Sequence, residues 1–311
     1  MFLKTQVIVN PESNQGRTKK RWNHIKLALK SFIKEFKCEF TERPFQAIEI
    51  SRAALKEGTE LIVGVGGDGT MNEIANGFFE NEKLINPSSV LGIIPSGTGC
   101  DFIRSLNIRS GLKNALEVIS NASSSLIDIG IARYTNHSSQ KKERFFLNVS
   151  DFGIGGEVIY HMNQNRMKRK GSSYLKSLIS TFITYKNKAI DIKIDDNDIP
   201  LQEYIVGAIS NGRIFGKGMK IAPHAKLDDG MFDVVLVRGM KFFEFFKNAW
   251  RIYSGTHLFH PKVSLIRGKK IEASPHNKDE YILIEIDGEQ LGRLPATFEI
   301  IPKTFLVKGT I

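Results

Sequence analysis

The stretch Leu61–Phe78, LIVGVGGDGTMNEIANGF, decides the fold of the N-terminal half of the chain. Its first residues, Leu61–Val63, form a short apolar run that is typical of a buried strand in a parallel sheet. A glycine turn follows, and after it the apolar face of a helix consists of Met71, Ile74, Ala75 and Phe78. Thr70 and Glu73 have the spacing of a capping box, which predicts that this helix begins at Thr70.

A strand, a glycine turn and an open helix N-terminus together form an anion site, because backbone N–H groups point outward and glycine lets a phosphate come close. Gly64, Gly66 and Gly69 match the GxGxxG dinucleotide fingerprint literally. That fingerprint needs an acidic residue at the end of the next strand, and this chain has Ile94–Ser96 there. Asp68 would also repel a bare pyrophosphate, so the loop favours a site with Mg²⁺ or other charged groups nearby.

A second loop repeats the pattern. The apolar run Val90–Ile94 ends in Pro95–Phe102, PSGTGCDF, and a helical pattern follows. Two loops with glycine, hydroxyl and acidic residues at neighbouring strand ends predict one crevice, because open α/β sheets bind ligands at such edges.

Strand and helix patterns alternate through the first half of the chain, which predicts a parallel sheet covered by helices. The predicted strands are Gln6–Val9, Cys38–Thr41, Leu61–Val63 and Val90–Ile94. The predicted helices contain Trp22 to Phe36, Ala47–Lys56 and Leu112–Ile119. Gly58 is placed to end the second of these helices.

After Ser123–Ser125 the pattern changes to period two, as in Ile190, Ile192 and Ile194, and it predicts a mainly antiparallel β half. Further strands are predicted at Ile127–Ile131, Tyr204–Ile209, Asp233–Arg238 and Tyr281–Ile286. One helix is predicted around Leu175–Phe182 and another around Phe242–Tyr253. The polar stretch Asn136–Glu143 is expected to be an exposed loop.

Composition narrows the class of protein. The chain has 311 residues, which favours two domains, and a formal net charge of +11, which favours an anionic partner. Cys38 and Cys100 lack metal-ligand spacing and are expected to be reduced thiols of a cytoplasmic protein. No apolar run approaches the ~18 residues of a membrane span, so any membrane contact is expected to be peripheral.

At its two glycine loops the sequence resembles the diacylglycerol kinase catalytic family, which includes bacterial soluble lipid kinases and the sphingosine and ceramide kinases. The matching motifs run through nearly the whole chain: Asn10-Pro11, Gly66–Thr70 with Asn72-Glu73, Gly97–Gly99 with Asp101-Phe102, Asn148 with Gly153, Pro223–Ala225, Asp228–Gly230 and Asp287–Glu289. NAD kinases and phosphofructokinases carry loops similar to GGDGT, so the ordered set is the specific signal. The family often has Asn where this chain has Cys100, and the glycine of the first loop comes later than in many members.

The resemblance implies an α/β nucleotide domain with a parallel sheet, similar to NAD kinase and phosphofructokinase, at residues 1–125. It implies an antiparallel β-sandwich lipid-substrate domain at 126–296, with 297–311 returning to the first domain. It also implies ATP and Mg²⁺ as cofactors. The residues that would contact ATP are Asn10, Pro11, Glu12, Ser13, Asn14, Thr41, Gly66, Gly67, Asp68, Gly69, Thr70, Met71, Asn72, Glu73 and Thr98.

Two acidic or metal-binding groups follow from the same resemblance. Asp68, Asp101 and Asp128 would form a charged network with Mg²⁺ and water. Lys226, Asp229 and Met231 would hold a structural Mg²⁺, with Lys226 and Met231 contributing backbone carbonyls. Asp228–Gly230 is also an ordinary turn sequence.

Phosphoryl transfer depends mainly on positioning and charge neutralisation, and the acceptor hydroxyl needs a carboxylate to orient it or take its proton. Asp68 would help to hold Mg²⁺, and either Asp287 or Glu289 is the candidate base, since the sequence does not separate them. Asp287-Gly288 alone would be read as a plain hairpin turn.

The predicted function is therefore ATP-dependent transfer of phosphate to a lipid hydroxyl, with diacylglycerol as the leading acceptor, by a cytoplasmic enzyme peripheral to the inner face of an anionic membrane. The basic run Arg166–Lys170 is a candidate contact with that membrane. A kinase of a soluble acceptor such as NAD is the first alternative, and a non-catalytic nucleotide-dependent lipid-binding protein is the second. No nucleic-acid recognition motif is present, and a homodimer is left open.

Overall fold

A computed structural model of the protein describes residues 4–167 and 174–311. The chain divides into two compact units, and each is described by itself. Unit 1 contains residues 1–129, 227–229 and 302–311, and unit 2 contains residues 130–226 and 230–301. The predicted boundaries lay at 125/126 and 296/297, and residues 227–229 had been predicted to belong to the second domain.

Unit 1 is built on a parallel sheet with the strand order β16-β6-β3-β1-β2. Its strands are β1 (Thr5–Val9), β2 (Lys37–Phe40), β3 (Leu61–Gly66), β6 (Val90–Pro95) and the end of β16 (Glu289–Lys308). In register, Val9 lies beside Val65 and Gly66 beside Pro95, so the carboxyl ends of β1, β3 and β6 meet at one edge. Val307 of β16 pairs with Leu91, which brings the end of the chain into this sheet.

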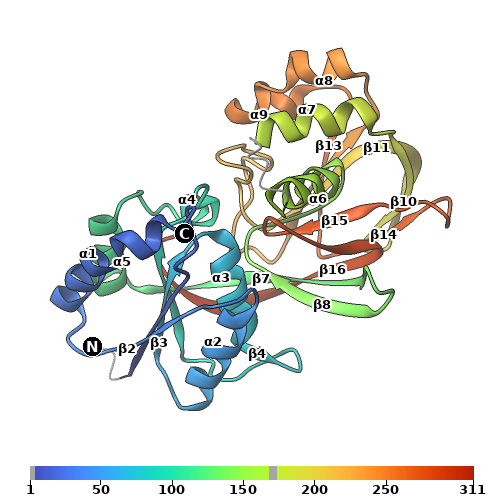
Figure 1. Cartoon of the computed structure of the whole chain (residues 1–311). Helices are drawn as coiled ribbons and strands as arrows, with labels where there is room; N and C mark the ends of the chain where they lie inside the picture. The colour runs from blue at the N-terminus through green and yellow to red at the C-terminus, as the bar shows by residue number, and fades with distance from the viewer. Residues whose placement is uncertain (1–3, 168–173) are drawn as a thin grey trace. The chain divides into compact units, whose positions relative to one another are not determined.

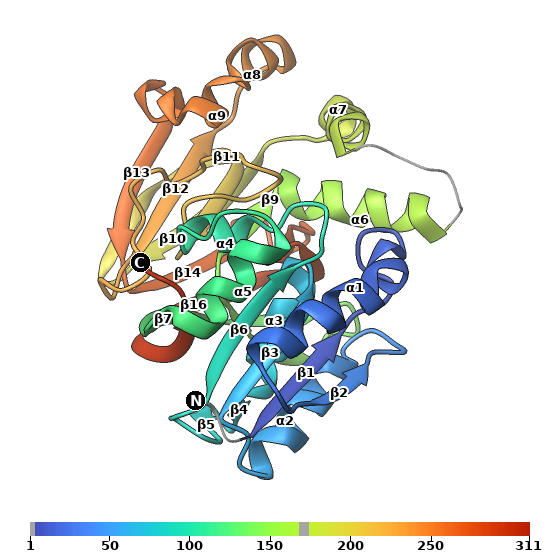
Figure 2. The ribbon, with the colours of Figure 1, turned by 90° about the vertical axis from the view of Figure 1, so that its left-hand side faces the viewer.

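Helices cover both faces of this sheet (Figure 2). One face carries α1 (Arg17–Phe32) and α5 (Leu112–Asn121), and Trp22, Ile25 and Leu29 of α1 pack with Leu116 of α5 over the strands. The other elements are α2 (Gln46–Lys56), α3 (Asp68–Gly77), α4 (Asp101–Ser105) and the small hairpin of β4 (Phe79–Glu80) and β5 (Lys83–Leu84). The predicted first helix was too long, because α1 ends at Phe32 and residues 33–36 lead into β2.

Unit 2 is mainly antiparallel, with β13-β12-β11-β10-β14-β16 as neighbours in order (Figure 1). Its strands are β7 (Ser124–Asn136), β8 (Lys141–Phe146), β9 (Val149–Gly153), β10 (Lys188–Ile194), β11 (Asn197–Ser210), β12 (Phe232–Arg238), β13 (Val263–Gly268), β14 (Lys270–Pro275) and β15 (Leu283–Ile286). Its helices are α6 (Ile154–Met167), α7 (Tyr174–Thr184), α8 (Phe242–Asn248), α9 (Arg251–Ser254) and the 3₁₀ turn η1 (Thr256–Phe259).

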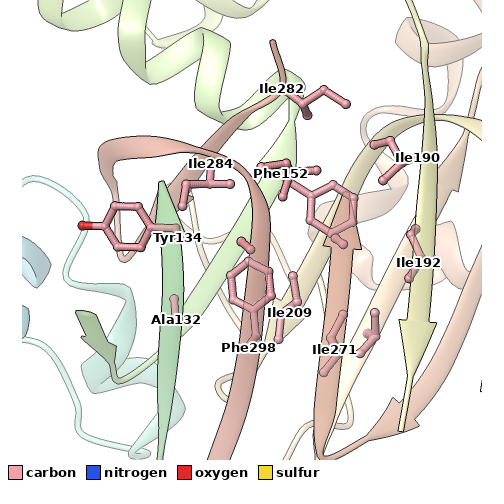
Figure 3. Packing of buried hydrophobic residues seen from close by; sticks show 14 of the residues in the cluster. Ala132, Tyr134, Phe152, Ile190, Ile192, Ile209, Ile271, Ile282, Ile284 and Phe298 are labelled. Carbon is pink, nitrogen blue, oxygen red and sulfur yellow. The ribbon is translucent and has the colours of Figure 1, made fainter. Parts of the chain in front are cut away.

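Successive residues of β12 enter two different cores, as the alternation of a strand requires. Val234 and Leu236 face the core between the strands, which is shown in part in Figure 3, whereas Val235 and Val237 face a second core. The second core is completed by helical residues such as Val158 of α6 and Phe182 of α7. A strand that is buried on both faces, such as β12, reads as an apolar run rather than as a period-two pattern.

Three expectations for unit 2 need correction. The segment Phe242–Tyr253 forms two short helices, α8 and α9, rather than one. Residues 141–143 of the expected loop belong to β8, so the exposed turn is confined to 137–140. Strand 281–286 begins at Leu283, and its hairpin partner β16 had not been predicted. The described residues include no helix long and apolar enough to cross a membrane.

Candidate active site

The glycine loop after β3 places the start of α3 at the carboxyl edge of the unit 1 sheet. The helix begins at Asp68, two residues earlier than predicted. The first hydrogen bond of the helix runs from the Met71 N–H to Gly67 O at 3.1 Å. The N–H groups of the first turn have no acceptor within the helix itself. They are the anion-binding groups that the sequence predicted at this position.

The predicted capping box is wrong. The start of α3 has no side-chain cap, and the Glu73 carboxylate instead accepts the N–H of Ala47 in the first turn of α2 at 3.2 Å. An acidic residue is favourable there, because the N-terminus of a helix carries partial positive charge. Glu73 therefore ties α3 to α2, and nothing in its contacts identifies it as a nucleotide ligand.

The second loop touches the first through backbone. A Cβ on Gly97 would lie 2.4 Å from the Cα of Gly67, so the two loops can approach this closely only because both residues are glycine. The Ser96 N–H donates to Gly66 O at 2.8 Å and continues the register of β3 and β6 past the strand ends. The two glycine loops are therefore neighbours, as the sequence predicted, and the ligand crevice between them stays a prediction.

Asp68 is the centre of this edge. One of its carboxylate oxygens accepts the N–H of Asp101 at 3.0 Å, and the other accepts the N–H of Phe102 at 3.1 Å. These donors belong to the first turn of α4, so Asp68 fixes α4 against the start of α3. Asp101 is buried, with Arg104 Nη1 3.5 Å from its carboxylate.

Cys100 precedes α4 in the left-handed conformation, with φ of 51°. Asn tolerates this conformation better than most residues, which explains the family's usual Asn at this position. The Gly97 N–H lies 3.2 Å from the Cys100 sulfur, and burial raises the pKa of the thiol to about 11. Cys100 is thus a neutral thiol that closes the second loop. Burial likewise raises the pKa of Cys38 to about 11, and both thiols are free.

The first loop is connected to both others by side chains. Asn10 Nδ2 donates to Thr70 Oγ1 at 3.0 Å, which joins the end of β1 to α3. Thr18 of α1 exchanges hydrogen bonds with Ser13 Oγ at 2.5 Å and with Ser96 Oγ at 2.6 Å. Sequence reasoning missed Thr18 and Ser96, although hydroxyl residues beside strand ends were a usable signal.

The remaining predicted nucleotide ligands differ in exposure. Thr98 is exposed at the tip of its loop, whereas Met71 and Asn72 are 2% and 1% exposed. Thr41 is also buried, and its N–H pairs with Val9 O at 2.9 Å. Pro11 and Asn14 are half-buried in the first loop and Glu12 is exposed. The side chains of Met71 and Asn72 are thus too buried to contact a ligand directly in this structure.

The predicted metal residues are partly accounted for. Asp68 and Asp101 are brought together. The Asp128 carboxylate accepts the Lys303 N–H at 2.7 Å. Lys226, Asp229 and Met231 fall where the chain passes between the two units, and their role as a metal site stays a prediction. Among the described residues there is no cluster of three or more His, Cys, Asp or Glu side chains that could hold a metal ion.

These loops fit a nucleotide triphosphate. A Cβ on Gly97 would fill the narrow space between the two loops, which glycine leaves open. The open first turn of α3 supplies N–H donors to phosphate oxygens. The carboxylates of Asp68 and Asp101 would hold Mg²⁺ together with phosphate oxygens, because this ion prefers hard oxygen ligands.

In unit 2 the Asp287-Gly288 turn joins β15 to β16. Both residues have positive φ, 46° and 88°, which is the conformation of a two-residue hairpin turn. The Asp287 side chain is buried and its carboxylate accepts N–H groups from Leu147, Asn148 and Val149 at 2.8, 3.0 and 3.0 Å. The turn is therefore both a hairpin and an anchor for the start of β9.

Glu289 follows the turn in a different environment. It is partly exposed, and Arg144 Nη2 of β8 lies 3.6 Å from its carboxylate. The three backbone donors on Asp287 distinguish the two candidate bases, which the sequence could not do.

An apolar cavity of about 300 Å³ opens in unit 2 under α8 and α9. Its walls include Phe245, Phe246 and Trp250 from the helices and Val206 and Val237 from β11 and β12. The aromatic residues of α8 pack with Phe182 of α7, and they also leave this space.

A parallel sheet with phosphate-binding glycine loops, followed by an antiparallel unit with an acidic hairpin, defines the class of two-domain kinases that share the NAD kinase architecture. Comparison with known proteins agrees. Residues 4–132 match the model of the diacylglycerol kinase catalytic domain, and residues 148–308 match the YegS C-terminal NAD kinase beta sandwich-like domain.

Curated relatives match over nearly the full length. A diacylglycerol kinase of Staphylococcus haemolyticus is 30% identical over 302 residues, which is 94% of this chain and 84% of the relative. A diacylglycerol kinase of Staphylococcus aureus is 29% identical over 96% of this chain and 90% of its own length. The chain belongs to the diacylglycerol kinase catalytic family.

Solved structures show the same fold. A crystal structure of a diacylglycerol kinase from Bacillus anthracis has a TM-score of 0.72 at 20% identity and covers 99% of this chain and 97% of its own. An NAD kinase from Archaeoglobus fulgidus, solved in complex with ATP, has a TM-score of 0.52 at 14% identity and covers 98% and 94%. The predicted fold class is thereby confirmed.

Proposed function

We propose that this protein transfers the γ-phosphate of ATP to the hydroxyl group of a lipid, with diacylglycerol as the leading acceptor. The observation that carries the proposal is the apolar cavity of unit 2, about 300 Å³ in volume, in a chain whose family is a kinase family. A soluble acceptor such as NAD has no use for walls made of Phe245, Phe246 and Trp250, whereas an acyl chain is stabilised by them.

Unit 1 binds and orients the nucleotide in this proposal. The first-turn N–H groups of α3 hold phosphate oxygens, and the contact of Gly67 with Gly97 lets the backbone approach them. Asp68 keeps the two helix starts in place and, with Asp101, would hold Mg²⁺. When bound, the ion supplies charge neutralisation for the transferred phosphoryl group.

We assign the two hairpin carboxylates different roles. A carboxylate has roughly four acceptor positions, and backbone N–H groups occupy three of these positions on Asp287. Glu289 is the more accessible group, so it takes the proton of the acceptor hydroxyl while Asp287 holds the hairpin in position.

Peripheral contact with an anionic membrane is part of the proposal. Phe243, Trp250 and Phe259 are 84%, 65% and 81% exposed on α8, the α8–α9 link and η1, and Lys241 and Lys247 are exposed on the same segment. Exposed aromatic rings beside lysines suit the interface of an anionic bilayer. The basic run 166–170 lies outside the residues whose side chains the structure describes.

The deciding experiment offers the purified protein radiolabelled ATP and Mg²⁺ with three separate acceptors. These are diacylglycerol in phosphatidylglycerol vesicles, the same vesicles alone, and NAD in solution. Label in phosphatidic acid supports the proposal. Label in NAD alone establishes the soluble-acceptor alternative, and ATP binding with no labelled product in any arm establishes the non-catalytic one.

The membrane surface has its own test, which is sedimentation with phosphatidylglycerol vesicles. The double substitution Phe243→Ser and Phe259→Ser is expected to lower vesicle-bound protein at least severalfold. Leu27→Ser is the matched control, because Leu27 is 71% exposed on α1 of unit 1 and lies outside the aromatic segment. Equal loss in both proteins would contradict this surface.

A further inference from the structure

The cavity under α8 and α9 is mostly apolar, but one wall carries a carboxyl group. Asp151, in the middle of β9, is the one carboxyl among the described residues that line it. The Asp151 side chain is 1% exposed. A carboxyl buried against aromatic and aliphatic walls is costly unless something hydrogen-bonds to it.

The partners that Asp151 has in the protein do not satisfy it. Within the described residues, neither of its oxygens has a hydrogen-bond partner of ordinary geometry. The Gly156 N–H and the Glu285 carboxyl lie beside it, and together they would use at most two of the roughly four acceptor positions of its carboxyl group. The first turn of α6 covers it so closely that a Cβ on Gly155 would lie 2.2 Å from Asp151 Oδ2.

Glu285 faces Asp151 directly across the β9–β15 pair. Two carboxyl groups at opposed positions on adjacent strands repel each other when both are charged. Burial, with Glu285 as the second cause, raises the pKa of Asp151 well above its usual range, and burial also raises the pKa of Glu285. Burial and mutual repulsion therefore favour a pair that shares a proton, and Asp151, which lines the cavity, keeps lone pairs available.

We infer that Asp151 is a specificity-determining residue of the cavity and accepts a hydrogen bond from the hydroxyl group of the bound lipid. This inference rests on the proposed function and names the chemistry that the cavity selects. The combination of an apolar chain with a neutral O–H donor satisfies both the walls and the unpaired oxygen.

Other polar ligands fit less well. A phosphate or carboxylate would be repelled by the acidic pair, and a ketone or ether offers no donor to Asp151. Among the other polar lining residues, Asn248 Nδ2 donates to Glu244 O at 2.8 Å. His257 Nε2 lies 3.0 Å from Ile221 O, and its buried Nδ1 has no partner among the described residues, so it is a second acceptor that would also favour a hydroxyl donor. A hydroxyl is the neutral group that needs an acceptor of the kind that Asp151 provides.

The pair also connects the cavity to the acidic hairpin. Glu285 Oε1 accepts the N–H of Gly288 at 2.7 Å, so the residue that faces Asp151 also holds the Asp287-Gly288 turn. A hydroxyl bound at Asp151 would therefore contact the same strand pair, β9 and β15, that positions Glu289.

The experiment compares two small ligands with equal numbers of heavy atoms, 1-octanol and methyl heptyl ether, which differ in having or lacking an O–H donor. Trp250 lines the cavity, so its fluorescence reports binding without ATP or turnover. The wild-type protein is expected to bind the alcohol about tenfold more tightly than the ether, as one hydrogen bond allows. Asp151→Ala is expected to lose this preference and to keep its affinity for the ether.

Asn248→Ala is the matched control, because it removes another polar residue of the same cavity and should leave the preference intact. Asp151→Asn keeps the size and an acceptor oxygen, so it is expected to retain part of the preference if Asp151→Ala does not fold. Equal binding of both ligands by the wild type, or a full preference in folded Asp151→Ala, would overturn the inference. Preference for the alcohol without any lipid phosphorylation would overturn the proposed function alone.

Discussion

The two aspartate loops of this protein look alike in sequence and differ in what their carboxylates do. Asp68 in unit 1 follows a strand and receives two backbone N–H groups, from Asp101 and Phe102 of α4. Asp287 in unit 2 also follows a strand and receives three, from the residues that lead into β9. In both loops the carboxylate stabilises a segment distant in sequence rather than its own turn.

The difference lies in what each region leaves unsatisfied. In unit 1 the unpaired groups are N–H donors at the start of α3, which suit an anion. In the described part of unit 2 the carboxyl group of Asp151 is one of the buried polar groups without a partner, and its place in an apolar cavity suits a hydroxyl. The comparison teaches that ligand chemistry is indicated by the polar atoms that the fold does not pair, more than by the acidic residues that it does.

The largest expected effect is at Asp287. Asp287→Ala leaves three N–H groups without their acceptor, and we expect a loss of about 3 to 5 kcal/mol in the free energy of unfolding of unit 2 together with loss of transfer. Urea denaturation and the lipid kinase assay measure the two losses.

Glu289→Gln separates positioning from proton transfer, because Glu289 is partly exposed and has no backbone donors among its given contacts. It should change the free energy of unfolding by less than about 1 kcal/mol and still abolish transfer. ATP binding should persist in both variants. Normal turnover of Glu289→Gln would assign the proton to another group and undo the contrast between the two carboxylates.

Gly97→Ala tests the backbone contact of unit 1. Its Cβ would lie 2.4 Å from Gly67 Cα, so the loops must separate and the phosphate site should widen. We expect ATP affinity to fall at least about tenfold, measured by calorimetry. Gly67→Ala is the comparison, since its Cβ would come no closer than 3.3 Å to Gly97 Cα and should cost less. An unchanged affinity in Gly97→Ala would show that the contact does not shape the site.

The acidic pair of unit 2 predicts a dependence of stability on pH. The folded-state pKa of Asp151 is raised above the unfolded value near 4, because of burial and then of Glu285, so its contribution is full below that value and is lost as pH rises toward the folded pKa. The groups that face the pair are the Gly156 N–H, the Tyr185 hydroxyl and Asp287, which acts on Glu285.

Asp151→Asn should therefore flatten the decline in the free energy of unfolding between about pH 4 and pH 8. Urea midpoints measured at several pH values check this. Asp279→Asn is the control, because Asp279 is exposed in the segment before β15 and should leave the slope as it is in the wild type. A slope that is the same in all three proteins would show that Asp151 titrates normally.

The smallest expected effect is at Cys100, which has φ of 51°. Cys100→Asn places a residue that tolerates the left-handed conformation there, and we expect a gain of about 0.5 kcal/mol with ATP affinity retained. Thermal unfolding measures the gain. A loss of stability would show that the contact between the Gly97 N–H and the sulfur outweighs the backbone preference.

Much of unit 1 was predictable because its signals are local. The apolar strand Leu61–Val63, the glycine turn and the apolar face of α3 lie within one stretch, so the parallel sheet and its two glycine loops followed from neighbouring residues. The start of α3 was misplaced because the Glu73 side chain bonds to α2, an interaction that spans 26 residues. The long strand β16 was missed because its partners are far away in sequence.

The sequence by itself determined the order of the motifs, the fold class and the family, since these depend on residue types in a fixed succession. Only the tertiary structure decided which carboxylates are paired with backbone and which are not, because hydrogen bonds from Leu147 to Asp287 or across the β9–β15 pair join residues more than a hundred positions apart. The oxygens of Asp151 are buried without a partner among the described residues only once the strands are assembled, and no local sequence pattern predicts this.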